Sequence, residues 1–317
     1  MLDTAEFRTI IGKIKDFNTV ILLQHQNPDG DALGSSLGLG HFIRHHYPQK
    51  RVLGWVSTMP DYLRFLQPLP QATAHDFKGA LVIISDTANV SRIDGGNWQA
   101  GAFVIKIDHH HQSEAYADLN LNCSHRIANA EIVGALLLTT KMRMPPLAAQ
   151  ALYTGIVSDS NRFLYHRTDA QTLSLAAKLL PLVPDVQLIY NQLYAHSYDL
   201  FKLKLAIAQR LKLSSSGLGS IVLTDHDLKQ LCTTAQVAKQ QIGFFTSIRE
   251  LKIMLMVVED KPRQQIKFSL RSKRLNVMSV CRVYGGGGHP LAAAGFLSTW
   301  SDLPALMARL ATLVAKQ

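Results

Sequence analysis

The sequence contains only three cysteines, Cys123, Cys232 and Cys281, among 317 residues. They are far apart and odd in number, so they suggest neither a disulfide framework nor a CxxC zinc site. Long apolar runs are lacking as well, because none approaches the roughly 20 residues that cross a bilayer. The N-terminus carries Asp3 and Glu6 where a signal peptide has a basic start and an apolar run. These absences predict a soluble, cytoplasmic protein that does not associate with membranes.

Charged residues make up 18% of the chain and hydrophobic residues 47%, a balance that excludes a disordered or fibrous protein. A length of 317 residues exceeds the roughly 100–200 residues of one domain, so we expect two domains. The net charge of +10 is unevenly placed: residues 201–317 contain 17 Lys/Arg against 6 Asp/Glu, and the first 200 residues contain 16 against 17. This basic third predicts either contact with a polyanion, such as a nucleotide or nucleic acid, or simply a basic solvated surface.

In the first half of the chain, short runs rich in Val and Ile alternate with helical patterns. Their length and composition predict buried strands at residues 20–24, 51–57, 80–86 and 102–108. The apolar spacing of residues 32–46 is helical, and from about 130 to 180 the pattern is helical throughout. Alternating strands and helices predict an α/β domain with a mainly parallel sheet flanked by helices.

A connector is predicted to follow this domain. The segment PLVPDV breaks the helical pattern, and YDLFKLKLAIAQRLKL then predicts one long amphipathic helix. After the turn-rich SSSGLGS come strand-like runs and helical patterns of a second, smaller α/β domain. We therefore expect an N-terminal domain at residues 1–185, a linker helix at 186–215 and a C-terminal domain at 216–317.

Acidic and histidine side chains gather where the predicted strands end and where two helices begin or end. The set is His25, Asp29, Asp31, Asp86, Asp108, His109, His110 and Asp159. In an open parallel sheet, ligands bind beyond the carboxyl ends of the strands. Carboxylates so close together repel one another unless cations neutralise them. Oxygen ligands mixed with imidazole favour Mn²⁺, with Mg²⁺ and Fe²⁺ as alternatives.

Each of these residues also has an ordinary interpretation. Asp29 and Asp31 can cap the helix that starts near residue 32. His25 and Asp86 can be polar residues at a strand end and in a turn, and residues 108–111 can form a His-rich surface loop. Taken together, their order and spacing favour one two-metal site.

A second motif, YGGGGHPLAAAG, spans residues 284–295. Consecutive glycines let the backbone approach an anion closely, and the alanines that follow predict a helix whose N–H groups face a phosphate or carboxylate. A flexible turn is the ordinary interpretation of such a run. Elsewhere, Arg162 suits phosphate binding and Phe163 suits base stacking, although a core aromatic explains Phe163 at least as well.

These motifs together resemble the DHH phosphoesterase superfamily with a C-terminal DHHA1 domain. The matching segments are HxxPDGDAxGS at 25–35, DTA at 86–88, DHH at 108–110, TGIxSDxxxF at 154–163, FSLRS at 268–272 and the glycine motif. The resemblance extends from about residue 15 to 300. It departs from many relatives at His111, where proline is common, and at Ser160-Asn161, where Thr-Gly is common.

The resemblance implies roles for individual residues. One metal ion is implied on His25, Asp29 and Asp86, and a second on Asp31, Asp86, His109 and Asp159. Asp86 would bridge the two ions, His110 would face the substrate phosphate, and Asp108 would orient a histidine. In the C-terminal domain the implied substrate contacts are Arg271 and His289, with Gly287 and Gly288 as the phosphate cradle.

Size and domain order most resemble the nano-RNase (oligoribonuclease) and pAp-phosphatase branch. That resemblance implies hydrolysis of linear dinucleotides, such as pGpG or pApA, and of very short RNA to mononucleotides by a water that two Mn²⁺ ions activate. The substrate would lie in a cleft between the two domains. Such a cleft suits a short nucleotide better than a long duplex. One alternative is a pAp phosphatase. The other is a non-catalytic nucleotide-binding module, and such a module would be expected to lack one of the metal-binding residues. The resemblance also allows a homodimer.

Overall fold

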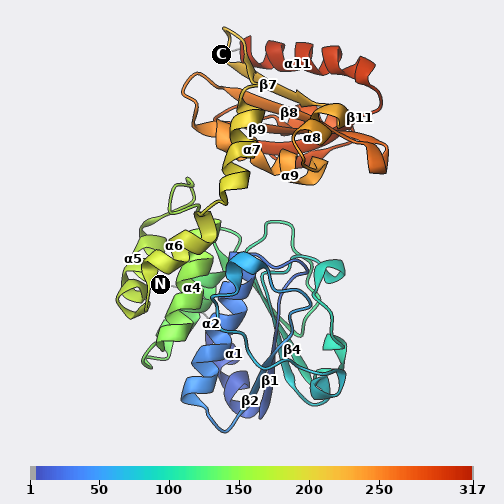
Figure 1. Ribbon diagram of the computed structural model, residues 1–317. Coiled ribbons are helices and arrows are strands. Elements are labelled where there is room, and N and C mark those ends of the chain that lie inside the picture. Colours follow the sequence, from blue (N-terminus) through green and yellow to red (C-terminus); the bar gives the residue numbers. More distant parts are fainter. Residues whose placement is uncertain (1–4, 316–317) are drawn as a thin grey trace. The chain divides into compact units, whose positions relative to one another are not determined.

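The computed structural model describes residues 5–315. The chain forms two compact units, a first unit at Met1–Ala195 and a second unit at His196–Gln317. Each unit has its own β-sheet with helices packed on it, as Figure 1 shows. The α/β fold class predicted from the alternating pattern is therefore confirmed.

The first unit is built on a five-stranded, fully parallel sheet in the order β2-β1-β3-β4-β5. The strands are β1 (Thr19–Leu23), β2 (Arg51–Gly54), β3 (Leu81–Ser85), β4 (Phe103–Asp108) and β5 (Leu119–Asn122). The first four were predicted from their apolar runs; β5 was not, because its LNLN sequence is short and half polar. Since β1 pairs with β2 on one side and β3 on the other, the strand order reverses at β1, the point where ligands bind in such sheets.

The long helices of the first unit pack on one face of this sheet. They are α1 (Ala5–Asp16), α2 (Gly30–His46), α3 (Asn129–Thr139), α4 (Pro146–Asp159) and α5 (Ala170–Leu179) (Figure 1). Alternate strand residues separate the two faces: Leu22 and Ile83 join the helices in one core, whereas Ile21 and Val82 join a second core. Irregular segments and short 3₁₀ turns cover that second face.

Helices α2 and α4 pack closely because two glycines face each other at their crossing. A Cβ atom on Gly34 would lie 2.5 Å from the carbonyl oxygen of Ala151 and 2.9 Å from Cα of Gly155. A Cβ atom on Gly155 would lie 3.0 Å from Oδ1 of Asp31. This close approach therefore brings the first turn of α2 beside the last turn of α4.

The predicted linker helix is two shorter helices. These are α6 (Val186–Tyr194), which belongs to the first unit, and α7 (Tyr198–Ala208), which belongs to the second. Ala195 ends α6 with an extended backbone, and the side chain of Ser197 then caps α7 by accepting the N–H of Leu200 at 3.1 Å. The amphipathic helix predicted from YDLFKLKLAIAQRLKL begins with α7 but ends at Ala208, and Lys212 and Leu213 form β6 instead.

The second unit contains a six-stranded mixed sheet in the order β10-β11-β9-β8-β7-β6. Its strands are β6 (Lys212–Leu213), β7 (Leu218–Leu223), β8 (Ile253–Asp260), β9 (Gln265–Ser272), β10 (Gly287–His289) and β11 (Ala292–Leu297). Its remaining helices are α8 (Asp225–Gln230), α9 (Ala235–Gln240), α10 (Met278–Val283) and α11 (Leu303–Ala315). Helices α10 and α11 cover one face of the sheet, and α7, α8 and α9 cover part of the other (Figure 1).

The helix predicted after the glycine run is wrong. The alanines lie in β11, which pairs antiparallel with both β10 and β9, and burial alternates along it. Alanine favours a helix in isolation, but here two neighbouring strands supply the backbone hydrogen bonds, and tertiary pairing overrides that preference. The glycine run therefore does not lead into a helix N-terminus.

Across residues 5–315, no single helix is long and apolar enough to cross a membrane. One pair of consecutive helical segments, Ala170–Leu182 and Val186–Tyr194, reaches the required length and composition together. These two segments are bent by 116° at their break.

We predict that Gly34→Ala destabilises the first unit by about 1–3 kcal/mol, because the added methyl group overlaps the backbone of α4. Gly12→Ala in α1 is the matched control: its Cβ would meet no described atom within 4 Å, so we expect a gain of about 0.5–1 kcal/mol from helix propensity. Urea denaturation followed by tryptophan fluorescence in a Trp300→Phe background measures both. Equal stabilities for the two variants would contradict the proposed close packing.

Candidate metal centre

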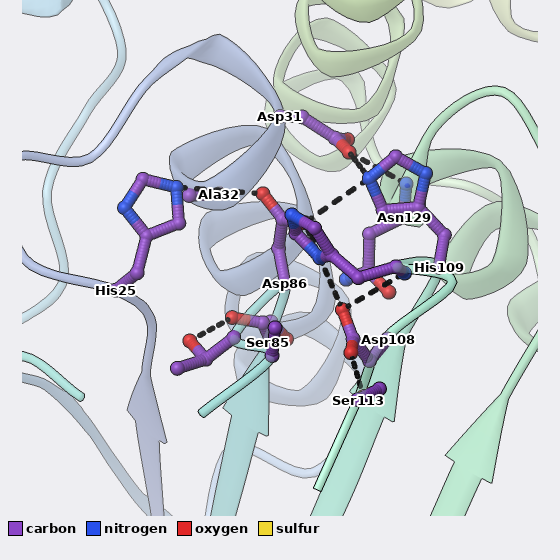
Figure 2. Close-up of polar contacts among 12 residues, drawn as sticks. His25, Asp31, Ala32, Ser85, Asp86, Asp108, His109, Ser113 and Asn129 are labelled. Carbon is purple, nitrogen blue, oxygen red and sulfur yellow. Dashed lines mark hydrogen bonds and ion pairs between the residues drawn. The ribbon is translucent and has the colours of Figure 1, made fainter. Parts of the chain in front are cut away.

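Three neighbouring strands deliver the central side chains. His25 follows β1, Asp86 follows β3, and His109 follows β4, and because these strands are parallel and adjacent their carboxyl ends lie together. Figure 2 shows the side chains of Asp31, Asp86 and His109 pointing toward one another, with His25 on the other side of Asp86. Asp86 is 2% exposed and has a left-handed backbone with φ of 53°, a conformation that is unfavourable for aspartate and is found at functional sites.

One group of possible metal donors consists of His25, Asp29 and Asp86. Nε2 of His25 lies 3.8 Å from Oδ2 of Asp29 and 3.6 Å from Oδ2 of Asp86. Nδ1 of His25 is 2.9 Å from the carbonyl of Gln26, which leaves Nε2 to face the carboxylates. Asp29 is also the N-cap of α2, since its Oδ1 accepts the N–H of Ala32 at 3.1 Å. The ordinary interpretation of Asp29 and the metal interpretation therefore use different oxygens of one carboxylate.

A second group consists of Asp31, His109 and Asp159. Nε2 of His109 lies 3.7 Å from Oδ2 of Asp31, 3.5 Å from Oδ2 of Asp159 and 3.3 Å from Oδ1 of Asp86. Asp31 was expected just before the helix that starts near residue 32, but it lies in the first turn of α2 and is fully buried. Asp159 is the last residue of α4, as its position after an apolar helical stretch predicted.

These distances fit metal coordination. Two ligand atoms that each lie about 2.1 Å from one ion are about 3.0–3.5 Å apart, close to the separations between His109 and its carboxylates. Oδ1 of Asp86 is buried and has no hydrogen-bond partner among the described residues. A buried carboxylate oxygen without a donor is costly, so this atom calls for a cation. The carboxylate and imidazole donors suit Mn²⁺ or a similar divalent ion.

The electrostatics agree with that fit. Burial alone would lower the pKa of His25, but hydrogen bonding to the carboxylates beside it raises the pKa to about 10. Burial likewise opposes the charge on His109, yet Asp86 and Asp31 raise its pKa to about 10. The pKa of Asp159 is raised to about 7, first by burial and then by the charge of Asp86. The crowded carboxylates thus hold positive charge strongly, which is what a divalent-cation site requires.

His110 is held differently from His109. Its Nδ1 donates to Oδ1 of the fully buried Asp108 at 2.7 Å, and the ring is about one third exposed. Nδ1 of His110 lies 3.6 Å from Oδ1 of Asp86. Because this nitrogen already donates a hydrogen bond to Asp108, it is poorly placed to be a metal ligand. Hydrogen bonding to His110 and to Ser113 holds the pKa of Asp108 below its usual range, against the effect of burial. Asp108 is therefore an anion that orients the His110 ring.

Lys106 is a residue that the sequence reasoning missed. It lies within β4 and is only 1% exposed, which is rare for a lysine. Nζ lies 3.4 Å from Oδ2 of Asp108, and it donates to Oγ of Ser113 and to the carbonyls of Ala88 and Glu114, at 3.1 and 2.6 Å for the two carbonyls. A lone lysine in the apolar run FVIKID was the available signal, since a charge in a buried strand requires a partner.

Comparison with known proteins agrees with this geometry. The DHH family, N-terminal domain, matches residues 19–156, and the DHHA1 domain matches residues 227–316. The chain belongs to the DHH family. The resemblance inferred from the motifs is thus confirmed.

Similar proteins include the bifunctional oligoribonuclease and PAP phosphatase NrnA of Bacillus subtilis, which is 34% identical over 96% of this chain and 97% of that protein. The probable bifunctional oligoribonuclease and PAP phosphatase NrnA of Streptococcus mutans is 33% identical over 90% of this chain and 92% of that protein. Among solved structures, an exopolyphosphatase-related protein from Bacteroides fragilis superposes with a TM-score of 0.83. It is 22% identical and covers 97% of this chain and 96% of its own, a likeness that shows the shared fold.

The departure from the DHH pattern after Asp159 has a structural explanation. Asn161, Arg162 and Phe163 have successive left-handed backbones, with φ of 48°, 61° and 64°. Glycine adopts this conformation freely and asparagine tolerates it better than most residues, so Asn161 can stand where glycine is common. Buried Ser160 stabilises the turn by accepting the N–H of Phe163 at 2.9 Å.

Arg162 and Phe163 leave this turn in different environments. Arg162 is exposed, and its guanidinium lies 4.5 Å from the centre of the Tyr194 ring. Phe163 is half-buried and packs against the core of the first unit, with its ring centre 6.3 Å from that of Tyr153. The packing of Phe163 favours the interpretation as a core aromatic, whereas Arg162 keeps a charged group at the surface.

In the DHHA1 part, pairing between strands brings two predicted contact residues together. Ala292 of β11 pairs with Arg271 of β9 on one side and with His289 of β10 on the other. Directly paired residues project from the same face of a sheet, so Arg271 and His289 flank the small Ala292 side chain. Gly287 and Gly288 precede His289 in the exposed β10. Gly288 has φ of 138°, and a Cβ there would lie 2.5 Å from the carbonyl oxygen of Ala292, so the hairpin requires glycine.

We predict that Lys106→Met destabilises the metal-free protein by about 3–5 kcal/mol, because it leaves the buried charge of Asp108 without its cation. Lys106→Met combined with Asp108→Asn should cost less than the sum of the single changes, since the unpaired charge is then absent. Urea denaturation of the four proteins measures this cycle. Additive costs would show that the two side chains do not interact.

Proposed function

We propose that this protein is a metal-dependent phosphodiesterase that hydrolyses linear dinucleotides, such as pGpG or pApA, and very short RNA to mononucleotides. The observation that carries the proposal is that Asp86 lies between the two donor groups: it belongs to the group with His25 and Asp29, and its Oδ1 lies 3.3 Å from Nε2 of His109 in the second group. Two ions that share one carboxylate are the arrangement suited to phosphoryl-ester hydrolysis. The similarity to proteins named oligoribonuclease and PAP phosphatase along nearly their whole length supports the substrate class.

The proposed ligand sets follow the two groups. His25, Asp29 and Asp86 would hold one ion, and Asp31, Asp86, His109 and Asp159 would hold the other. When bound, such a pair of cations supplies an activated water for attack on phosphorus and offsets charge on the phosphoryl oxygens. We propose Mn²⁺ for both positions, with Mg²⁺ or Fe²⁺ as alternatives, because oxygen and imidazole ligands are mixed.

His110 is proposed as the residue that acts on the substrate directly. Asp108 accepts a hydrogen bond from Nδ1 of His110, with a nitrogen–oxygen distance of 2.7 Å. Nε2 of His110 therefore remains to donate a hydrogen bond or a proton to the leaving oxygen. Asp108 acts by orienting that ring, and Lys106 neutralises Asp108 from within the sheet. No side chain of the chain has to attack phosphorus, because the nucleophile is water.

The second unit is proposed to select the substrate. Arg271 and His289 would contact a phosphate or the nucleotide, with Gly287 and Gly288 as the backbone cradle. The excess of positive charge in residues 201–317 supports this assignment, because short nucleotides are polyanions. In the first unit, Arg162 is the better candidate for a substrate contact than Phe163, since it is exposed.

The larger organisation is part of the same proposal. We assign catalysis to residues 1–185, the connection to residues 186–215 and substrate binding to residues 216–317. Short linear nucleotides arise from RNA turnover and from the opening of cyclic dinucleotides, so we place the protein in the cytoplasm. A homodimer is compatible with this function but is not required by it.

A pAp phosphatase is the second candidate function, and the names of the similar proteins favour it. The same centre would then remove the 3′ phosphate of 3′-phosphoadenosine 5′-phosphate. A non-catalytic nucleotide-binding module is less well supported, because every residue that the metal sets require is present.

With Mn²⁺, we expect the purified protein to release mononucleotides from pApA, pGpG and RNA of three to five residues, and to act poorly on long duplex RNA. Removal of the metal with EDTA should lower the rate by about 1,000-fold or more, because the ions supply several kcal/mol of transition-state stabilisation. Chromatography of the products measures both. Faster phosphate release from pAp would favour the phosphatase, and failure to cleave any dinucleotide would contradict the main proposal.

We predict that His110→Ala and Asp86→Asn separate chemistry from metal binding. His110→Ala should lower kcat by about 10²–10⁴-fold while bound Mn²⁺ stays at the wild-type level. Asp86→Asn should lose bound metal as well as activity, because it removes the shared ligand. Metal analysis after gel filtration distinguishes them, with the exposed Asp61→Asn as a control that changes neither. Metal loss in His110→Ala would instead make His110 a ligand.

A further inference from the structure

One short segment contacts two side chains of the metal centre. Residues 124–130 lie between β5 and the first turn of α3. The carbonyl oxygen of Arg126 lies 3.3 Å from Nδ1 of His109. Because Nε2 of His109 faces the carboxylates, Nδ1 carries the hydrogen that this carbonyl accepts in a hydrogen bond. The N–H of Asn129 donates to Oδ2 of Asp31 at 2.6 Å (Figure 2). The N–H of Ala130 donates to Oδ1 of Asp31 at 2.8 Å.

This segment depends on contacts from outside itself. The residue before α3 is Ala128, whose methyl group cannot cap a helix, so Asp31 supplies the cap from a position 98 residues away from Asn129. Ahead of Ala128 the chain forms a turn, in which Arg126 donates its N–H to the carbonyl of Cys123 at 2.9 Å. The orientation of the His109 ring and of Asp31 therefore depends on what holds this turn in place.

The side chain of Arg126 is the main support. It is 6% exposed, and its guanidinium donates to Glu131 in α3 at 2.8 Å, to Gln171 in α5 and to Asp169, the N-cap of α5, at 3.4 Å. The Arg167 guanidinium adds a second support by donating to the carbonyls of Ser124 and Arg126. Arg126 thus ties the turn to two helices.

We propose that Arg126 is a positioning residue that sets the metal affinity of the centre, because its side chain fixes the carbonyl and N–H groups that orient His109 and Asp31. Partners of metal ligands fix the ring orientation and basicity of those ligands, and their loss typically lowers metal affinity or activity by about 10–100-fold. The Arg126 guanidinium contacts Glu131, Asp169 and Gln171, none of which is a proposed metal ligand, so its effect should fall on metal binding rather than on the chemical step.

A cavity next to this arginine allows a direct test. It has a volume of about 200 Å³ and is lined by Arg126, Glu131, Leu138, Leu175 and Lys178, among others. Truncation of Arg126 would enlarge it toward Glu131 and Asp169, the carboxylates that bind the guanidinium. We expect a free guanidinium ion to enter this space and replace the lost group.

The experiment compares wild type, Arg126→Ala and Arg51→Ala after metal removal, with Mn²⁺ titrated by calorimetry. We expect Arg126→Ala to bind Mn²⁺ about 10–100-fold more weakly. Its kcat at saturating Mn²⁺ should stay within about threefold of wild type, since the ligands themselves remain. Millimolar guanidinium chloride should restore much of the affinity. Arg51→Ala removes another arginine–carboxylate pair of the first unit, with Asp76, and should change neither quantity.

Three results would overturn the proposal: wild-type Mn²⁺ affinity in Arg126→Ala, a fall in kcat at saturating metal without a fall in affinity, or a loss of affinity that guanidinium leaves unchanged. If Arg126→Ala does not fold, Gln171→Ala decides the question, because it removes one acceptor of the guanidinium from an exposed position. Weaker Mn²⁺ binding in Gln171→Ala would support the proposal, and unchanged binding would overturn it. Metal affinity is measured without a substrate, so this test is independent of the proposed hydrolytic function.

Discussion

The structure of the first unit depends on the repulsion among four aspartates, Asp29, Asp31, Asp86 and Asp159, that the fold brings into one place. Asp31 and Asp86 are buried, where uncompensated charge is costly. The chain offsets part of this cost with N–H groups at the starts of α2 and α3 and with the imidazoles of His25 and His109. In the function that we propose, cations would complete the compensation. The positions of the strand ends, helix ends and glycines can be understood as serving that one requirement.

Packing between two helices sets the spacing of the carboxylates. Helices α2 and α4 approach closely at Gly34 and Gly155, and this approach places Asp31, in the first turn of α2, beside Asp159, at the end of α4. Asp31 itself has two roles, because it caps α3 and also faces His109. Asp31 therefore both caps a helix and faces the site, which links the stability of α3 to the geometry of the site.

Much of the fold and the candidate site could be predicted from the chain alone, and the failures have identifiable causes. Strands β1 and β3 are almost entirely apolar, and β4 is an apolar run interrupted by Lys106; a buried parallel strand leaves that signature. Strand β5 is half polar, and the alanines of β11 take their structure from two neighbours, so neither had a local signal. Asp29 illustrates a different limit: helix capping and metal binding looked like alternatives in sequence, but its capping contact and its contact with His25 use separate oxygens.

By itself, the sequence determined which side chains are candidate metal donors, since only certain residue types can hold divalent cations, and the motif spacing placed them at strand and helix ends. It also determined that the positive charge lies in residues 201–317. The tertiary structure alone decided which atoms meet: that Lys106 lies beneath Asp108, that the Arg126 carbonyl faces His109, and that Arg271 and His289 share one face of a sheet. The physical reason is distance along the chain, because contacts between residues far apart in sequence form only when whole elements pack together.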